Sequence, residues 1–224
     1  MDTLLDIFTA IGIGAAAGLA PLVAIAATVL LATLHVGINP ESSDFKIITD
    51  SAFVLIAVVV LVQSLLSDTT PGGLRFRIAA DRPRLAWLIW VVAAVCGGFA
   101  GAVVFEAQAH PPAVGAVLAG ASAVLVSFAA TGFFGRVGAR LQSKAQANAA
   151  KHQDKQKDAG KDQAADKTSG RSLALLVDVL TLIAVVLALV VPPTGLILPI
   201  FAVVLLFGVR RKKGQKYEGL RVLR

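Results

Sequence analysis

Asp178 is an acidic residue inside a long apolar stretch, in the run LALLVDVLTL. An ionisable side chain within a membrane span is costly, usually faces the interior of the helix bundle, and marks a functional site by default. There it could take up and release a proton or hold a cation. The structural alternative is an acid at the end of a helix, hydrated by the interface or bonded to a neighbouring helix. The sequence leaves both interpretations open.

A buried carboxyl group needs hydrogen-bond donors around it. The candidates for a polar core around Asp178 are three threonines and one amide: Thr28, Thr131, Thr181 and Gln63. A single amide in a membrane helix also serves commonly as a helix–helix hydrogen bond, which is the alternative role of Gln63.

The sequence shows none of the side-chain arrangements that are common at catalytic sites. No Ser-His-Asp or Cys-His arrangement and no phosphate-binding loop is recognisable, so no catalytic residue is predicted. His35 and His110 are expected on one face, but no cysteine or acidic residue stands at metal-ligand spacing from them. We therefore predict no metal and no cofactor, and the chain is not expected to be an enzyme.

The elements that would position Asp178 are long apolar runs. The chain has 224 residues, of which 56% are hydrophobic, and its mean hydropathy is +0.77. Each run is near the roughly 20 residues that a spanning helix needs, and none shows the alternation of a membrane β-barrel. The sequence predicts an all-α, polytopic membrane bundle of six transmembrane helices, at about 4–36, 47–66, 86–105, 113–134, 172–191 and 196–209.

The first run contains the stretch GIGAAAGLAPLVAIAAT, with Gly12, Gly14, Gly18 and Pro21 inside it. Proline cannot donate the backbone hydrogen bond that an unbroken helix uses, and glycines allow close helix approach. We expect a closely packed, broken helix. The run is longer than one crossing requires, so it could tilt, divide into a half-helix and a span, or re-enter and leave the amino terminus outside.

The same stretch recurs after a shift of 103 positions, where residues 115–131 read GAVLAGASAVLVSFAAT, with Gly115 and Gly120 as packing glycines. The halves of this repeat are about 4–107 and 112–209. Because three spans separate the two copies, the repeat is expected to be inverted, as in many transporters.

Positive charge is sorted by segment. Segment 68–84 holds four Lys/Arg, segment 135–171 holds nine and the tail 210–224 holds seven, which leaves only Lys46 of the 21. Six crossings would put all three basic segments on the cytoplasmic face of the inner membrane, together with both termini. We therefore expect the basic residues, which give the chain a net charge of +7, to bind the membrane surface rather than nucleic acid.

The basic segments are expected to differ in form. Residues 74–85 read LRFRIAADRPRL, and their arginines could bind anionic lipid headgroups: Arg75, Arg77, Arg82 and Arg84. Segment 135–171 is a charged cytoplasmic loop that is either a helical extension or disordered. The expected partners are the lipid bilayer and its headgroups, with a second copy or another membrane protein as further options.

Three stretches carry a family resemblance: GIGAAAGLAPLVAIA, SLLSDTTPG and SLALLVDVLTLIAVVLAL. They resemble the bacterial domain-of-unknown-function family 4126, whose members are small multi-pass membrane proteins, over about residues 11–207. The resemblance implies one acid late in the second apolar run (47–66), one at the end of that run and one in the fifth run (172–191). Asp68 and Asp178 match the last two, whereas Gln63 stands where the first acid is expected, which argues against a paired-carboxylate mechanism.

The function expected from these features is transporter-like, or permeation of a small solute, ion or lipid. The alternative is a structural or accessory subunit of a membrane complex that binds partners or anionic lipid through its basic loops. An enzyme acting on a lipid comes third, because the chain shows no nucleophile or metal cluster.

Overall fold

The computed structural model describes residues 2–36, 38, 47, 49–66, 86–152 and 159–207. This part of the chain is 92% helix and contains no strand, which confirms the all-α prediction. The helices are α1 (Asp2–Leu19), α2 (Pro21–Thr33), α3 (Ser51–Leu66), α5 (Ala86–Ala107), α6 (Pro112–His152) and α7 (Ala159–Val190). A 3₁₀ helix, η4 (Pro192–Leu196), continues directly into helical residues 197–207.

Two helical stretches are long and apolar enough to cross a membrane, Trp87–Ala107 in α5 and Pro112–Phe133 in α6. They give weak support to membrane association, since the buried core helix of a soluble protein meets the same criteria of length and composition. The remaining apolar helices are shorter, at 10–17 residues.

The first apolar run is broken, as predicted, between Leu19 and Pro21. Ala20 has an extended backbone (φ −142°, ψ 92°), and Pro21 stands at the start of α2. The N–H of Ala20 still donates to the carbonyl oxygen of Ala16 (3.1 Å), and the Ala20 carbonyl accepts from the N–H of Ala24 (2.9 Å). The break therefore bends the chain without exposing the backbone groups of Ala20.

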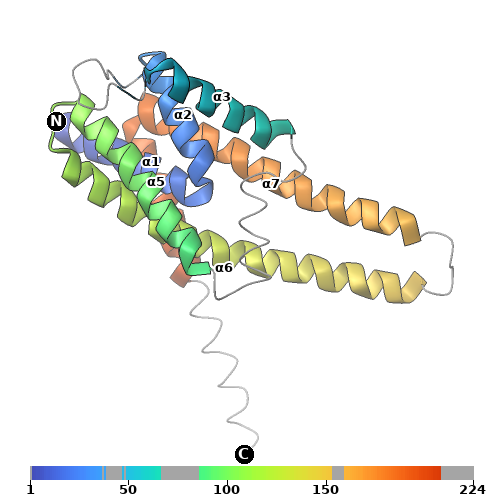
Figure 1. Ribbon diagram of the computed structural model, residues 1–224. Helices are drawn as coiled ribbons and strands as arrows, with labels where there is room; N and C mark the ends of the chain where they lie inside the picture. Colours follow the sequence, from blue (N-terminus) through green and yellow to red (C-terminus); the bar gives the residue numbers. More distant parts are fainter. Residues whose placement is uncertain are drawn as a thin grey trace, which may run out of the picture.

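The start of α1 lies beside the turns that join α5 to α6 and α7 to η4. Asp6 Oδ2 is 3.0 Å from His110 Nε2, and Phe8 and Gly12 lie against Gly195 of η4. We call this the turn end of the bundle, and the opposite end, from which α6 and α7 extend, the projecting end (Figure 1).

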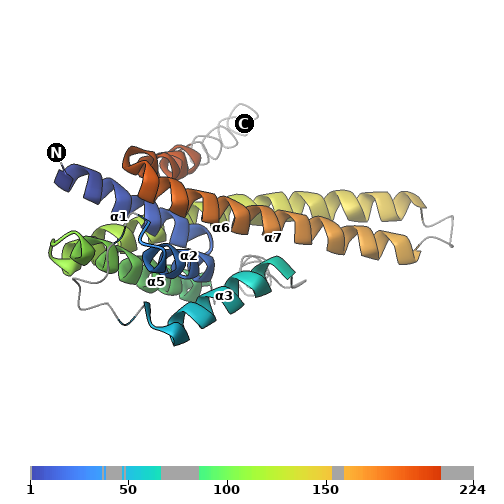
Figure 2. The same cartoon turned by 90° about the horizontal axis from the view of Figure 1, so that it is seen from above.

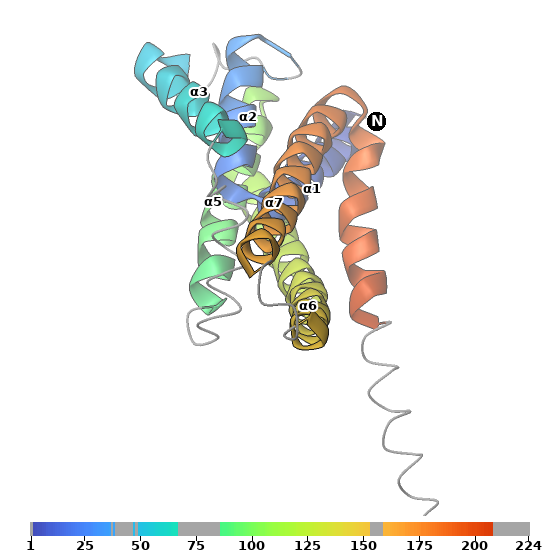
Figure 3. The ribbon, with the colours of Figure 1, turned by 90° about the vertical axis from the view of Figure 1, so that its right-hand side faces the viewer.

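From the break, α2 turns back at an angle to α1 and runs toward α3, so α1 and α2 form a V (Figures 1 and 3). The 18 residues of α1 and the 13 of α2 span about 27 and 20 Å, each less than the roughly 30 Å of a hydrocarbon core. The expectation of a full crossing by the first run, with the amino terminus beside the basic segments, is not confirmed and stays a prediction. Of the alternatives drawn from the sequence, the structure shows the division of the run into two helices, because the backbone is interrupted at Ala20.

Small residues allow α1, α5 and α6 to approach closely. A Cβ on Gly14 would lie 2.5 Å from the Cα of Ala119, and one on Gly18 would lie 2.6 Å from the carbonyl oxygen of Ala123. These two contacts advance in the same direction along both helices, so α1 and α6 are parallel.

The parallel course of α1 and α6 bears on the predicted inverted repeat. An inverted repeat requires these two segments to run in opposite directions, whereas both begin at the turn end. Helix α6 is also unbroken, with Val124 at the position that matches Pro21. The inverted repeat accordingly finds no support in the geometry.

The interior of the bundle consists mainly of small apolar side chains with a few polar ones, and the outer surface is also apolar. The buried polar side chains among the described residues are Thr9, Thr28, Ser122, Ser127, Asp178 and Thr181. Large apolar side chains are exposed on every outer helix, including Leu55 (67%), Val95 (66%) and Val117 (70%). Helix α3 lies at the edge of the bundle against α2, and residues 197–207 flank the opposite side (Figures 2 and 3).

Beyond the bundle, α6 continues to His152 and α7 begins at Ala159. Both helices extend in one direction from the bundle (Figure 1). Within segment 135–171, residues 135–152 and 159–171 are therefore helical. The arginine-rich segment 74–85 and the tail 210–224, including the four proposed headgroup ligands Arg75, Arg77, Arg82 and Arg84, lie outside the described residues.

Candidate functional site

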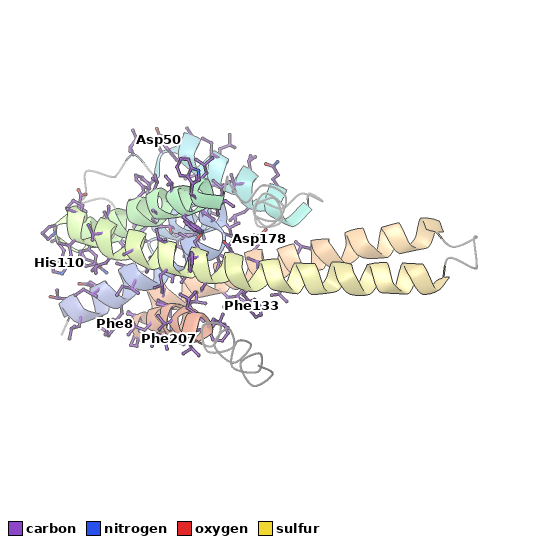
Figure 4. The ribbon with its side chains drawn as sticks, turned by 90° about the horizontal axis from the view of Figure 1, so that it is seen from below. Phe8, Asp50, His110, Phe133, Asp178 and Phe207 are labelled. Atoms are coloured by element: carbon purple, nitrogen blue, oxygen red, sulfur yellow. The ribbon has the colours of Figure 1, made fainter. Side chains whose placement is uncertain are left out.

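Asp178 lies on α7 inside the bundle, with only 2% of its surface exposed (Figure 4). Neither of its carboxyl oxygens has a hydrogen-bond partner within the described part of the chain. A buried polar group without a partner is unfavourable by about 1–3 kcal/mol, and more when it is charged. Such a group inside a helix bundle therefore identifies a candidate site for holding a ligand or a proton.

The helical period places Asp178 on the inner face of α7. Thr181 and Val185 follow it by three and seven residues, and both are completely buried. The Thr181 hydroxyl donates to the carbonyl oxygen of Val177 (2.8 Å). Its proton is thus committed to its own helix, and only the oxygen lone pairs of Thr181 remain for a neighbour.

The residue that precedes Asp178 packs near the break in the first apolar run. Val177, the residue before Asp178, belongs to the same buried cluster as Leu19, where α1 ends, and α7 contacts both α1 and α2. Helix α2 begins one residue after Ala20, which provides no side-chain cap, and its first turn has no acidic residue. An uncapped helix amino terminus carries partial positive charge.

The other predicted members of the polar core do not donate to Asp178. The Thr28 hydroxyl donates to Ala24 (2.8 Å) and that of Thr131 to Ser127 (2.7 Å), each four residues back on its own helix. Threonine hydroxyls in helices readily form this local bond, which is why the expected donors are already engaged. Gln63 is exposed on α3, so the predicted polar core is reduced to Asp178 with Thr181.

The predicted packing glycines are confirmed at close contacts, with one exception. Besides Gly14 and Gly18, a Cβ on Gly12 would lie 2.5 Å from the Cα of Gly195, and Gly115 lies against Gly101 and Phe105. Gly120 is looser, since its Cβ would lie 3.3 Å from the carbonyl oxygen of Ala94.

Two cross-helix contacts were not predicted from the sequence. Ser122 on α6 donates from its hydroxyl to the Ile11 carbonyl oxygen on α1 (3.0 Å) and to that of Ala119 (2.9 Å). The Asp6–His110 contact likewise joins α1 to the α5–α6 turn. The signal for Ser122 was its place in a Gly/Ala-rich run, which predicts close packing but not the partner.

The described residues hold no group of three or more His, Cys, Asp or Glu side chains that could bind a metal ion. An apolar hollow of about 140 Å³ lies between α1, α7 and η4, lined by residues that include Gly12, Leu180 and Leu198. Asp178 is not among its lining residues. The chemistry available to this site is therefore that of one buried carboxyl group.

The case for this site rests on its geometry. The resemblance to a family of small membrane proteins stays a prediction. No protein-family model, no curated protein and no solved structure matches this chain.

Proposed function

We propose that the chain is a multi-pass protein of the inner membrane that moves a small solute or ion, with Asp178 as its ionisable centre. The observation that carries this proposal is the 2% exposure of Asp178 together with its two unpartnered carboxyl oxygens. Ionisable residues buried inside membrane bundles mark ion pathways and proton relays. Broken helices at the same depth are a further feature of transporter sites.

The proposed topology has five crossings and one re-entrant hairpin. Helices α3, α5, α6, α7 and residues 197–207 each connect the two ends of the bundle, whereas α1 and α2 together enter and return at the turn end. All three basic segments then follow or precede helix ends at the projecting end, which the positive-inside rule assigns to the cytoplasm. The amino terminus is outside and the carboxyl terminus inside.

The surface supports a lipid environment. Soluble monomers rarely expose large continuous apolar patches, yet α3, α5 and α7 expose Leu55, Val95 and Leu176 at 61–67%. Lipid tails would cover these side chains, and anionic headgroups would contact the arginines at 75, 77, 82 and 84.

The test uses purified protein in phosphatidylethanolamine/phosphatidylglycerol vesicles on a solid-supported membrane. Concentration jumps of Na⁺, K⁺, chloride, phosphate and amino-acid mixtures are applied, and current and internal pH are recorded. We expect a response to at least one probe, loss of that response in Asp178→Asn, and retention in Asp50→Asn, which alters an exposed carboxylate bonded to the Ser51 N–H. Equal responses from wild type and Asp178→Asn would contradict the proposal.

A structural or accessory subunit is the second candidate. It is favoured by the close contacts of Gly14 and Gly18 with α6 and by a hollow that does not reach Asp178. On this alternative, folded protein gives no response to any probe, and Asp178→Asn changes only the thermal unfolding midpoint.

A further inference from the structure

We infer that Asp178 is a neutral, proton-bearing acid in the packed bundle, and that it ionises only when α7 separates from its neighbours and admits water. The packed arrangement is thus the proton-bound form of the protein. Coupling of this proton to a transported solute rests on the proposed function, whereas the protonation itself can be measured without any solute.

The first step concerns the burial of the carboxyl group. Asp178 is 2% exposed, and neither of its oxygens has a hydrogen-bond partner among the described groups. Burial of an isolated carboxylate is so unfavourable that the group takes up a proton instead. The packing around Asp178 therefore favours the neutral acid.

The second step concerns the hydroxyl groups that were predicted to donate to Asp178. Those of Thr28, Thr131 and Thr181 all donate to carbonyl oxygens of their own helices. Thr181 shares the buried face of α7 with Asp178, and its hydroxyl proton is already engaged with Val177. Its oxygen can still accept a hydrogen bond, which a protonated carboxyl group can donate and a carboxylate cannot.

The third step concerns the charges on the helices around α7, which contacts α1, α2, α3 and η4 and also packs against α6 and residues 197–207. The described side chains of α2, α3, α6, η4 and residues 197–207 include no acidic or basic group. Helix α1 carries Asp2 and Asp6 in its first two turns, and Asp6 contacts His110 at the turn end. Within these described parts, no surrounding helix brings a cationic side chain to Asp178.

Helix α7 itself carries one cation whose position must be tested. Arg171 precedes Asp178 by seven residues, which places both residues on the same face of the helix, about 10 Å apart along its axis. An ion pair between them would keep Asp178 ionised. Arg171 is therefore varied in the experiment.

The sign of the pH effect follows from the first step. The carboxyl group is neutral in the packed bundle and ionised wherever water reaches it, so the unfolded chain binds fewer protons than the packed one. Stability that is present at acidic pH is then lost as the pH rises. Asp178→Asn keeps the shape and the neutrality of the acid but cannot ionise, so it removes this loss.

The experiment records infrared difference spectra of the protein in phosphatidylethanolamine/phosphatidylglycerol vesicles as the pH is raised. At mildly acidic pH, where exposed carboxyl groups are already ionised, we expect wild type to retain the carbonyl stretching band of a protonated carboxyl group and to lose it toward alkaline pH. The band should be absent from Asp178→Asn, shifted in frequency in Asp178→Glu, and unchanged in Asp50→Asn, which alters an exposed carboxylate.

Thermal unfolding in detergent supplies a second measurement. The unfolding midpoint of wild type should fall relative to that of Asp178→Asn as the pH rises, and Arg171→Gln should leave this difference in place. If Asp178→Asn does not fold, the shifted band of Asp178→Glu still assigns the signal to residue 178.

Four results would overturn the inference. The first is the absence of the band from wild type, and the second is a band that residue 178 does not affect. The third is a band that appears only in Arg171→Gln, which would show an ion pair. The fourth is a wild-type midpoint that Na⁺ in place of choline raises at constant pH, with no effect on Asp178→Asn, which would identify a metal cation. The expected band in protein that moves no probe in the transport assay would refute the proposed function and leave the inference standing.

Discussion

Gly14 illustrates how little space separates α1 from α6. A Cβ at this position would lie 2.5 Å from the Cα of Ala119, so even alanine requires the two backbones to move apart. We expect Gly14→Ala to lower the free energy of unfolding by about 1–3 kcal/mol, the usual cost of overpacking.

Gly132 provides the matched control, because it lies on α6 and has nothing within 4 Å of its Cβ position. Gly132→Ala should stabilise the helix by up to about 1 kcal/mol. Thermal unfolding in detergent measures both variants. Equal effects of the two substitutions would show that the α1–α6 crossing is not as close as described.

Ser122 supplies a hydrogen bond between the same two helices. Its hydroxyl donates to the Ile11 carbonyl oxygen at 3.0 Å, and Ser122→Ala removes the donor with little change of volume. We expect a loss of about 0.5–1.5 kcal/mol in the free energy of unfolding. Thr131→Val is the control, since the Thr131 hydroxyl donates within its own helix; a larger loss in Thr131→Val would contradict the assignment.

At the residue scale, the sequence predicted that Asp178 would face the interior but not what would surround it. Its position in an apolar run was enough, because an acid there has few other places to lie. The hydroxyl groups of Thr28 and Thr131 donate within their own helices, because each has a carbonyl oxygen four residues back within reach. Whether a threonine bonds locally or across helices depends on helix rotation, which composition does not specify.

At the scale of elements, Pro21 both starts α2 and prevents a continuous helix through Ala20. Pro112 starts α6 in the same way, in an exposed position. A proline that fits its site stabilises by about 0.4–1 kcal/mol through the unfolded chain, so Pro112→Ala should cost that much. Pro21→Ala should lower the free energy of unfolding by more. The N–H of residue 21 could then donate to the Ala17 carbonyl oxygen, which would straighten the run and disrupt the packing of α2.

Thermal unfolding of the two alanine variants tests this difference. Equal losses would mean that packing, rather than Pro21, keeps α1 and α2 apart. From the sequence, proline and glycine predicted the break correctly. They could not predict the direction of α2 after it, because that depends on the contacts of α2 with α3 and α5.

At the scale of the whole molecule, the position of the amino terminus distinguishes five crossings from six. Thr3→Cys and Pro193→Cys, each in a Cys96→Ala background, place a thiol at exposed positions of the turn end. We expect a membrane-impermeant maleimide to label both from outside intact cells and to leave Lys157→Cys unlabelled. Labelling of Pro193→Cys but not Thr3→Cys would restore the six-crossing topology.

The clustering of basic residues in three segments could be predicted from the sequence, because lysine and arginine can be counted. The number of crossings could not, since one apolar run that returns to its starting face changes the location of the amino terminus and leaves the other segments unchanged. The charge pattern is the same for both topologies. The Asp6–His110 contact holds the start of α1 beside the α5–α6 turn and so favours the proposed five-crossing topology.

The continuation of α6 beyond the bundle gives the molecule a stiff lever. The 19 helical residues 134–152 add about 28 Å to the stretch Pro112–Phe133 at 1.5 Å per residue. A rigid tilt of about 10° at the bundle would therefore displace the tip by about 5 Å, from the same helical rise. Helix α7 projects in the same direction and carries Asp178 at its base, so a small change of angle there is magnified into a larger displacement at the tip.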